Sequence, residues 1–285
     1  RLGITKYQCQ SKKTRQTNRI INPKLYITMA SDISWKKIFD DTGMALHDFS
    51  KGPFVLEAEQ IKRSCHNFQR TAEKEVRILC KQDTRSDRPK VFRENNLFIL
   101  PKHNGVYYVV KGEGYVDIPD ITTPIQNYNS KLDFKLESSK VGDSEMQYLD
   151  FAYANSLIRT FMQDPTLVLT IRGRKYTPRF SFNVGNQRLT SDSVQTEVDA
   201  GYEGKNSIVL IEAKNSNATD TIIRQLYFPF RQWQLNTTKK VYPLFFERRF
   251  VDNEIIFYIW QYEFTNINDY NSIRLVKSAR YRIIE

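Results

Sequence analysis

The sequence is poor in cysteine and in long apolar runs. Its three cysteines, Cys9, Cys65 and Cys80, are an odd number at spacings that fit no metal-binding pair, which argues against a disulfide scaffold and favours free thiols. No apolar run approaches the length of a membrane span, and the N-terminus lacks the apolar core of a signal peptide. We therefore expect a soluble, cytoplasmic protein with no membrane partner.

Acidic residues are missing from residues 1–31, although this arm carries seven basic residues. The arm supplies +7 of the net charge of +11, so the rest of the chain is only mildly basic. Such an arm would favour binding of a polyanion such as a nucleic acid, because each contact to a phosphate releases counterions. A solvated tail is an equally good interpretation. Histidine is also scarce, and His47, His66 and His103 match no ligand spacing.

The chain has enough apolar residues to fill a sizeable core. Its 285 residues are 40% hydrophobic and 13% aromatic, which allows one large domain or two modest ones. Helical patterns are predicted over 32–49, 57–69 and 72–81. Apolar runs at 96–101 and 106–111 flank a turn that contains Asn104 and Gly105, which predicts a β-hairpin.

Helices followed by a basic hairpin predict a winged-helix-like α+β domain over residues 32–120. Such a domain reads DNA, although a lobe that merely supports the rest of the chain is the alternative. The basic stretch before the hairpin supplies candidate DNA contacts: Arg85, Arg88, Lys90 and Arg93.

A second domain is predicted over residues 140–285, after a linker at 121–139 whose start, 119–131, is polar and contains two prolines. A helix is predicted over 143–162, capped by Asp143 or Ser144. Strand patterns then follow, at 166–172, 176–184, 194–199, 208–213, 241–247 and 254–263. A helix over 220–233 crosses between them. The fold class is therefore α/β in the wider α+β sense, a mixed sheet flanked by helices.

Acidic and basic residues end two neighbouring strands of this domain. Glu212 and Lys214 follow the apolar run 208–211 and share one face of their strand, because side chains alternate. Asp199 and Glu197 share a face of the preceding strand. A turn with two glycines joins the strands, so a hairpin would bring Asp199 close to Glu212 and Lys214.

This grouping suits a hard divalent cation. Mg²⁺ prefers oxygen ligands and often takes one or two carboxylates, which Asp199 and Glu212 would supply, with the Ala213 carbonyl as a third ligand. Lys214 would orient the attacking water or stabilise negative charge on a phosphate. Glu197 is an alternative first acid. Glu145, on the preceding helix, is a candidate for a supporting group or a second metal ligand.

Taken together, residues 140–264 resemble the PD-(D/E)xK nuclease superfamily and, within it, the type II restriction endonucleases. Asp199 matches the first acid of the motif, Glu212 the second and Lys214 the lysine, whereas Val198 stands where the motif has proline. The segments 142–147, 198–203 and 224–230 are also similar to restriction-enzyme sequences. The resemblance implies Mg²⁺-dependent, sequence-specific cleavage of double-stranded DNA by a homodimer. It also implies a partner DNA methyltransferase that protects the host.

A more literal copy of the motif, Asp120 with Asp133 and Lys135, is rejected because no apolar strand precedes Asp133. An alternative for Asp199, Glu212 and Lys214 is a structural ion-pair network at a sheet edge. Outside the motif, Arg172, Arg174 and Lys175 are candidate phosphate contacts or a solvated face. Gln225, on the following helix, is a candidate contact to the substrate or to Lys214.

Three other functions stay open. One is a nuclease of the same fold with little sequence preference, such as a repair or defence enzyme. Another is a DNA-binding regulator with a degenerate nuclease fold, although the intact acidic and basic residues argue against it. The third is a nuclease that acts on RNA, which the basic arm fits equally well.

Overall fold

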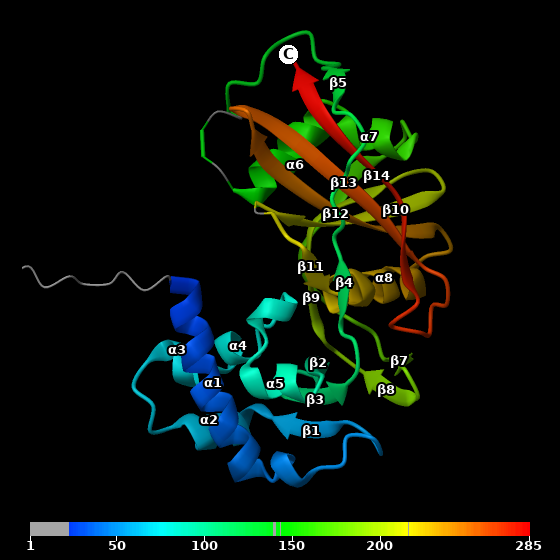
Figure 1. The fold of residues 1–285 in the computed structure, drawn as a ribbon. Helices are drawn as coiled ribbons and strands as arrows, with labels where there is room; N and C mark the ends of the chain where they lie inside the picture. Colours follow the sequence, from blue (N-terminus) through cyan, green and yellow to red (C-terminus); the bar gives the residue numbers. More distant parts are fainter. Residues whose placement is uncertain (1–22, 139–140, 143, 216) are drawn as a thin grey trace, which may run out of the picture.

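The structure is a computed structural model that describes residues 23–138, 141–142, 144–215 and 217–285 (Figure 1). Most of the predicted basic arm, residues 1–22, lies outside the described residues, as does Asp143, one of the two predicted helix caps. No helix in the described part of the chain is both long and apolar enough to cross a membrane.

An N-terminal unit packs several helices against a small sheet. Its helices are α1 (Pro23–Thr42), α2 (Ala58–Cys65), α3 (Thr71–Lys74), α4 (Val76–Leu79) and α5 (Lys90–Glu94), with 3-10 turns η1 (Met44–Leu46) and η2 (Arg85–Asp87). Its strands are β1 (Phe54–Glu57), β2 (Leu97–His103) and β3 (Val106–Lys111), in the order β1-β3-β2. The unit is therefore α+β, with helices followed by a hairpin as predicted.

The N-terminal core forms around aromatic rings from two helices. Trp35 and Phe39 of α1 meet Phe92 of α5 edge to face, with centroids 4.6 Å and 5.7 Å from the Phe92 ring. The buried indole of Trp35 donates a hydrogen bond of 3.0 Å to the carbonyl of Leu79. The predicted β2–β3 hairpin is confirmed, and Gly105 adopts a φ of 77° in its turn, a conformation that favours glycine.

A seven-stranded mixed sheet forms the centre of the rest of the chain, with strand order β5-β14-β13-β12-β10-β9-β6. Its strands are β5 (Gln126–Asn129), β6 (Val168–Tyr176), β9 (Gln195–Glu203), β10 (Ser207–Lys214), β12 (Lys240–Val251), β13 (Glu254–Phe264) and β14 (Ile273–Ile284). Two small pairs lie beside it, β4 (Tyr115–Asp117) with β11 (Asp220–Ile222) and β7 (Phe180–Val184) with β8 (Gln187–Ser191). Together with the flanking helices, this sheet confirms the predicted mixed α+β class.

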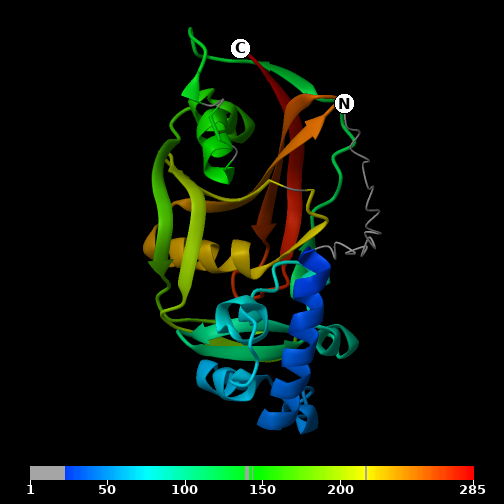
Figure 2. The same cartoon turned by 90° about the vertical axis from the view of Figure 1, so that its left-hand side faces the viewer.

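Helices cover both faces of the sheet (Figures 1 and 2). Helix α8 (Arg224–Asn236) packs on the face that carries Ile208 and Leu210 of β10. Helices α6 (Glu145–Ala154) and α7 (Leu157–Met162) pack on the other face, with Val209 and Ile211. Strand β10 is thus buried on both sides, which explains its uninterrupted apolar run. In both views the N-terminal unit lies at the end of the sheet nearest α8.

Several predicted helix boundaries are wrong. Helix α1 begins at Pro23 rather than at 32, since proline suits the first helical position. The helix predicted over 57–69 ends at Cys65, and the one over 72–81 is two single turns. The predicted 143–162 helix is interrupted at Ser156, whose left-handed φ of 61° cannot continue an α-helix. Ser144 is its N-cap and accepts from the Gln147 amide at 3.2 Å.

Some predicted loop and helix residues are strands. The polar segment 119–131 contains β5, which pairs in parallel with β14, so the prediction of a loop there is wrong over 126–129. Residues 220–222, predicted as the first turn of a helix, form β11 against β4. In both segments a tertiary partner supplies the hydrogen bonds that the local sequence does not suggest. Strands β1, β4, β8 and β14 were not predicted.

Candidate active site

The hairpin of β9 and β10 places Asp199 against the end of β10. The two strands pair antiparallel from Glu203 opposite Ile208 to Ala200 opposite Ile211. Beyond that point, a carboxylate oxygen of Asp199 accepts a hydrogen bond of 2.8 Å from the backbone amide of Ala213. The Asp199 carboxylate thus accepts a β10 amide in the way that backbone carbonyls of β9 do earlier in the hairpin. The predicted approach of Asp199 to the Glu212 strand is confirmed.

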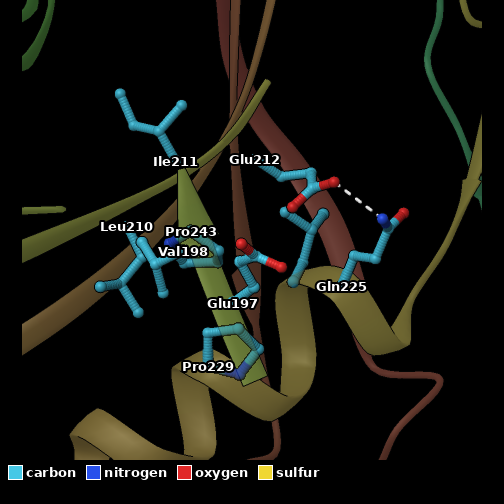
Figure 3. Close-up of a pocket in the computed structure, with 9 residues that line it drawn as sticks. Glu197, Val198, Leu210, Ile211, Glu212, Gln225, Pro229 and Pro243 are labelled. Atoms are coloured by element: carbon cyan, nitrogen blue, oxygen red, sulfur yellow. Dashed lines mark hydrogen bonds between the residues drawn. The ribbon is translucent and has the colours of Figure 1, made fainter. Parts of the chain in front are cut away.

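Glu212 lies at the centre of a hydrogen-bonded group and is only 8% exposed. Its Oε1 accepts from Lys214 Nζ, two residues on along β10, and from Gln225 Nε2 of helix α8 at 2.7 Å. The amide oxygen of Gln225 in turn accepts from the Thr221 hydroxyl at 2.8 Å. Figure 3 shows Gln225 pointing from α8 toward Glu212, with Glu197 on the neighbouring strand.

Burial makes the charged forms of both acids costly. It raises the pKa of Glu212 to about 7, against the opposing charge and hydrogen bond of Lys214, while the charge of Asp199 raises the pKa of Glu212 further. Burial likewise raises the pKa of Asp199, against the hydrogen bond from Ala213 and the charge of Lys214. Burial alone would lower the pKa of Lys214, but the charge of Glu212 outweighs it and the pKa is raised. Lys214 is therefore a cation that these carboxylates stabilise.

The three residues open into a cleft of about 580 Å³ between the sheet and the N-terminal unit. One wall carries Glu197, Asp199, Glu212 and Lys214, and the first turn of α8 closes one side with Arg224 and Gln225. The opposite wall comes from the N-terminal unit, with Arg77, Lys81, Asp83 and the β2–β3 turn residues His103, Asn104 and Gly105. A small cavity of about 10 Å³, room for one water molecule at most, lies behind Glu212 (Figure 3).

The residues at the cleft fit a hard divalent cation. The hydrogen bonds described for the two acids use one oxygen of each, Oδ2 of Asp199 and Oε1 of Glu212. The carbonyl of Ala213 points to the same side of β10 as its amide, the side on which Asp199 lies. No group of three His, Cys, Asp or Glu side chains among the described residues is arranged as a metal site. Two repelling carboxylates and one carbonyl suit Mg²⁺, which usually keeps several waters.

The remaining predicted acids lie at the margins of this group. Glu197 lines the cleft but is half exposed and pairs with Arg174 at 3.4 Å. Glu145, at the start of α6, accepts from the backbone amide of Asn215 at 3.3 Å, one residue beyond Lys214. Asp199, not Glu197, is therefore the acid that the β9–β10 hairpin places against Ala213. Glu145 contacts the end of β10 from the α6 side.

The three predicted phosphate contacts on β6 do not line the cleft. Arg172 pairs with Asp150 of α6, and Arg174 with Glu197. Lys175 is exposed on β6 and does not line the cleft. Gln225, predicted as a contact to the substrate or to Lys214, lines the cleft and donates a hydrogen bond to Glu212.

The four basic residues predicted to grip DNA from the N-terminal unit do not line the cleft either. Arg85 binds Asp117 at 2.6 Å and lies within 3.9 Å of Asp220. Arg88 donates to the carbonyl of Leu97 at 3.3 Å, and Arg93 to the carbonyl of Arg88 at 2.5 Å. Lys90 pairs with Glu94 at 3.6 Å. Three of the four cations therefore serve mainly to hold the N-terminal unit together or against β4 and β11.

The cleft also contains charged residues that the sequence did not single out. Arg77, Lys81 and Asp83 enter from the segment around α4, and Arg224 from α8. Arg77 and Lys81 have the spacing of neighbours on one helix face, which is a weak signal without a known target. Asp83 and Arg224 are 141 residues apart, and no local pattern relates them.

If the cleft cleaves DNA, as the sequence predicts, Gln225→Ala is expected to lower the rate constant for cleavage by about tenfold while leaving the KM for DNA within about twofold. Gln225 donates one of the two hydrogen bonds that Glu212 Oε1 accepts, and Lys214 donates the other. Loss of Gln225 therefore leaves Glu212 held on that oxygen by Lys214 alone, which weakens its placement. Steady-state cleavage kinetics would measure both constants. Gln234→Ala, a partly exposed residue further along α8 that does not line the cleft, is the control for helix damage. A rise in KM with an unchanged rate would contradict this positioning role.

Two family models match the chain, and both describe domains of unknown function. DUF6996 matches residues 32–109, and DUF6997 matches residues 110–282. The cleft lies at the junction, because Asp83 and the β2–β3 turn fall in the first match and Asp199, Glu212, Lys214 and Arg224 in the second. No curated protein and no solved structure matches the chain.

Proposed function

The chain belongs to the DUF6997 family, a domain of unknown function, and from the geometry of its cleft we propose that the protein is a Mg²⁺-dependent endonuclease that cuts double-stranded DNA at specific sites. The observation that carries the proposal is the group of Asp199, Glu212 and Lys214, with Glu212 buried and the other two partly exposed, at the floor of a cleft that also presents Arg77, Lys81 and Arg224. The likeness of these residues to the PD-(D/E)xK pattern supports the same reaction.

In this proposal each side chain has a distinct role. Asp199, Glu212 and the Ala213 carbonyl would hold Mg²⁺, which would supply Lewis-acid stabilisation of charge on the scissile phosphate. Lys214 is kept protonated by Glu212 and donates to the attacking water or to the phosphate oxygen on which charge develops. Gln225 holds the Glu212 carboxylate at a fixed angle. The buried floor limits competing water.

Sequence-specific cutting sets further requirements on the protein. The described part of the chain carries one group of this kind, so cutting both strands of a palindromic site needs two copies, and we propose a homodimer on DNA. The β2–β3 turn faces the cleft and is the part of the N-terminal unit best placed to contact base edges. As a restriction enzyme the protein would act with a DNA methyltransferase, in the cytoplasm, where the free thiols of Cys65 and Cys80 would persist.

The experiment that tests the proposal is digestion of phage-length DNA by the purified protein with and without Mg²⁺. Discrete fragments that require Mg²⁺ are the expected result. A Mg²⁺-dependent smear would favour a repair or defence nuclease with little sequence preference. Tight DNA binding without cutting under any divalent metal would favour a DNA-binding regulator. Faster cleavage of an RNA substrate than of DNA would favour an RNA-directed nuclease. Sedimentation with and without a cleaved duplex would test the dimer.

A further inference from the structure

An ion pair joins the two halves of the cleft wall. Asp83 lies in the loop between α4 and η2, and its carbonyl accepts a hydrogen bond of 2.8 Å from the backbone amide of Ile222. The preceding carbonyl, of Gln82, accepts from the Tyr115 hydroxyl at 3.0 Å. This fixed loop places the Asp83 carboxylate 3.7 Å from the guanidinium of Arg224. The N-terminal unit thus supplies the counter-charge for the first residue of α8.

Arg224 is held loosely for an arginine at a candidate active site. Its guanidinium has five N–H donors, and its described contact is the single ion pair to Asp83 at 3.7 Å. The side chain is 29% exposed and lines the cleft. A partly exposed pair of that length contributes little stability, because solvent screens it. Most donors of Arg224 therefore remain available to a ligand in the cleft.

The position of Arg224 relates it directly to the acidic group. Gln225, its neighbour in sequence, donates to Glu212, so the first turn of α8 carries both a holder of the catalytic acid and a cation. The charge of Asp83 acts on Glu212 and on Lys214, which places all of these groups within one electrostatic neighbourhood. Arg77 and Lys81 add positive charge on the facing wall. A phosphodiester that reached Lys214 would also meet Arg224.

We propose that Arg224 binds a phosphate of the substrate strand. In the unbound protein Asp83 keeps the guanidinium at the cleft through their ion pair, and the phosphate displaces Asp83. The inference rests on the proposed function in naming DNA as the source of the phosphate. Arginine suits the task because its planar fork binds phosphate oxygens in a bidentate manner. The exchange of a long carboxylate contact for a bidentate phosphate contact favours the bound state. The DUF6996 part of the chain thereby positions a substrate-binding residue of the DUF6997 part.

DNA binding without cleavage tests this exchange. The full-length protein, without divalent metal, is titrated with a short labelled duplex of mixed sequence over a range of salt concentrations. Arg224→Ala is expected to weaken binding by about five- to tenfold near 0.1 M salt and to reduce the salt slope by about one. Arg224→Lys keeps the charge, so its slope should match that of the unaltered protein while the affinity falls slightly. Asp83→Asn removes the competing anion and is expected to tighten binding by a few-fold.

Arg274→Ala is the matched control, because this arginine is exposed on β14, pairs with Glu263 and does not line the cleft. Its affinity and slope should stay within about twofold of the unaltered protein. If Arg224→Ala binds DNA with unchanged affinity and slope, or if Asp83→Asn weakens binding as much as Arg224→Ala does, the proposal is overturned. Should Arg224→Ala fail to fold, Arg224→Lys and Asp83→Asn still decide it.

The failure of this inference and that of the nuclease proposal are distinguishable. If the unaltered protein cuts DNA with Mg²⁺ but Arg224→Ala binds and cuts normally, the phosphate role of Arg224 is wrong and the nuclease remains. If the unaltered protein never cuts, yet Arg224→Ala loses one unit of salt slope and Asp83→Asn gains affinity, the phosphate site stands and the nuclease does not.

Discussion

Asp199→Asn and Lys214→Ala are each expected to lower the rate of Mg²⁺-dependent DNA cleavage by about 10³-fold or more, because each removes a charge that the reaction needs at the scissile phosphate. Asparagine keeps an oxygen that accepts the Ala213 amide at the Asp199 position, so the β9–β10 junction is retained while the metal loses an anionic ligand. Initial rates of plasmid linearisation at saturating Mg²⁺ would measure both losses.

Matched variants separate this loss from general damage to the protein. Glu263→Ala removes a carboxylate of β13 that pairs with Arg274, and Lys240→Ala removes an exposed lysine at the start of β12. Both should cut DNA at rates within about twofold of the unaltered protein, as surface substitutions usually do. Retention of more than a tenth of the activity by Asp199→Asn and by Lys214→Ala would mean that these residues form only a structural ion-pair network.

Stability gives an independent readout of the same residues. The pKa of Asp199 is raised in the folded protein by burial, so this acid binds a proton more readily when folded than when unfolded. Its charged form therefore destabilises the fold at neutral pH; this cost begins to fall as the pH drops through the folded pKa and is absent below the pKa of the unfolded chain. We expect Asp199→Asn to unfold at an equal or higher temperature than the unaltered protein at neutral pH, a pattern typical of functional sites.

The floor of the cleft could be predicted because its residues lie on neighbouring strands joined by a short turn. The apolar run 208–211 identified β10, and alternation along it placed Glu212 and Lys214 on one face. Gly201 and Gly204 pointed to the hairpin that brings Asp199 to Ala213, although Gly201 lies within β9 and only Gly204 is in the turn. All of this information is local to about sixteen residues of sequence.

The facing wall of the cleft could not be predicted, because its contacts are long-range. The carbonyl of Asp83 accepts a hydrogen bond from the Ile222 amide of β11, a strand that itself pairs with β4. Nothing in the sequence of residues 81–93 shows which of their charged side chains face the cleft. Density of basic residues therefore favoured Arg85 and Arg88, which the structure uses to bind Asp117 and Leu97. Strand β14 was missed for a related reason, since its Arg and Lys residues mask the alternation of a half-buried strand.

Trp260→Ala is expected to lower the free energy of unfolding by about 3–5 kcal/mol, a large share of the roughly 5–15 kcal/mol that stabilises a typical domain. Trp260 is fully buried in β13, where its ring meets Phe245 edge to face at 5.8 Å. Its indole also donates a hydrogen bond of 2.8 Å to the carbonyl of Pro119. Alanine would remove the packing and the bond together, and would leave a cavity beside Phe245 and the segment that follows β4.

Trp260→Phe divides that loss between its two sources. Phenylalanine keeps most of the ring packing but leaves the Pro119 carbonyl without its donor, at a cost of about 1–3 kcal/mol. Urea unfolding followed by circular dichroism would measure both variants, with Phe250→Ala on β12 as an exposed control expected within about 0.5 kcal/mol of the unaltered protein. A loss below 1 kcal/mol for Trp260→Ala would mean that the sheet can collapse around the cavity. The chain after β4 would then be held to the sheet mainly by the neighbouring Tyr262 hydroxyl, which donates to the carbonyl of Asp117 at 2.7 Å.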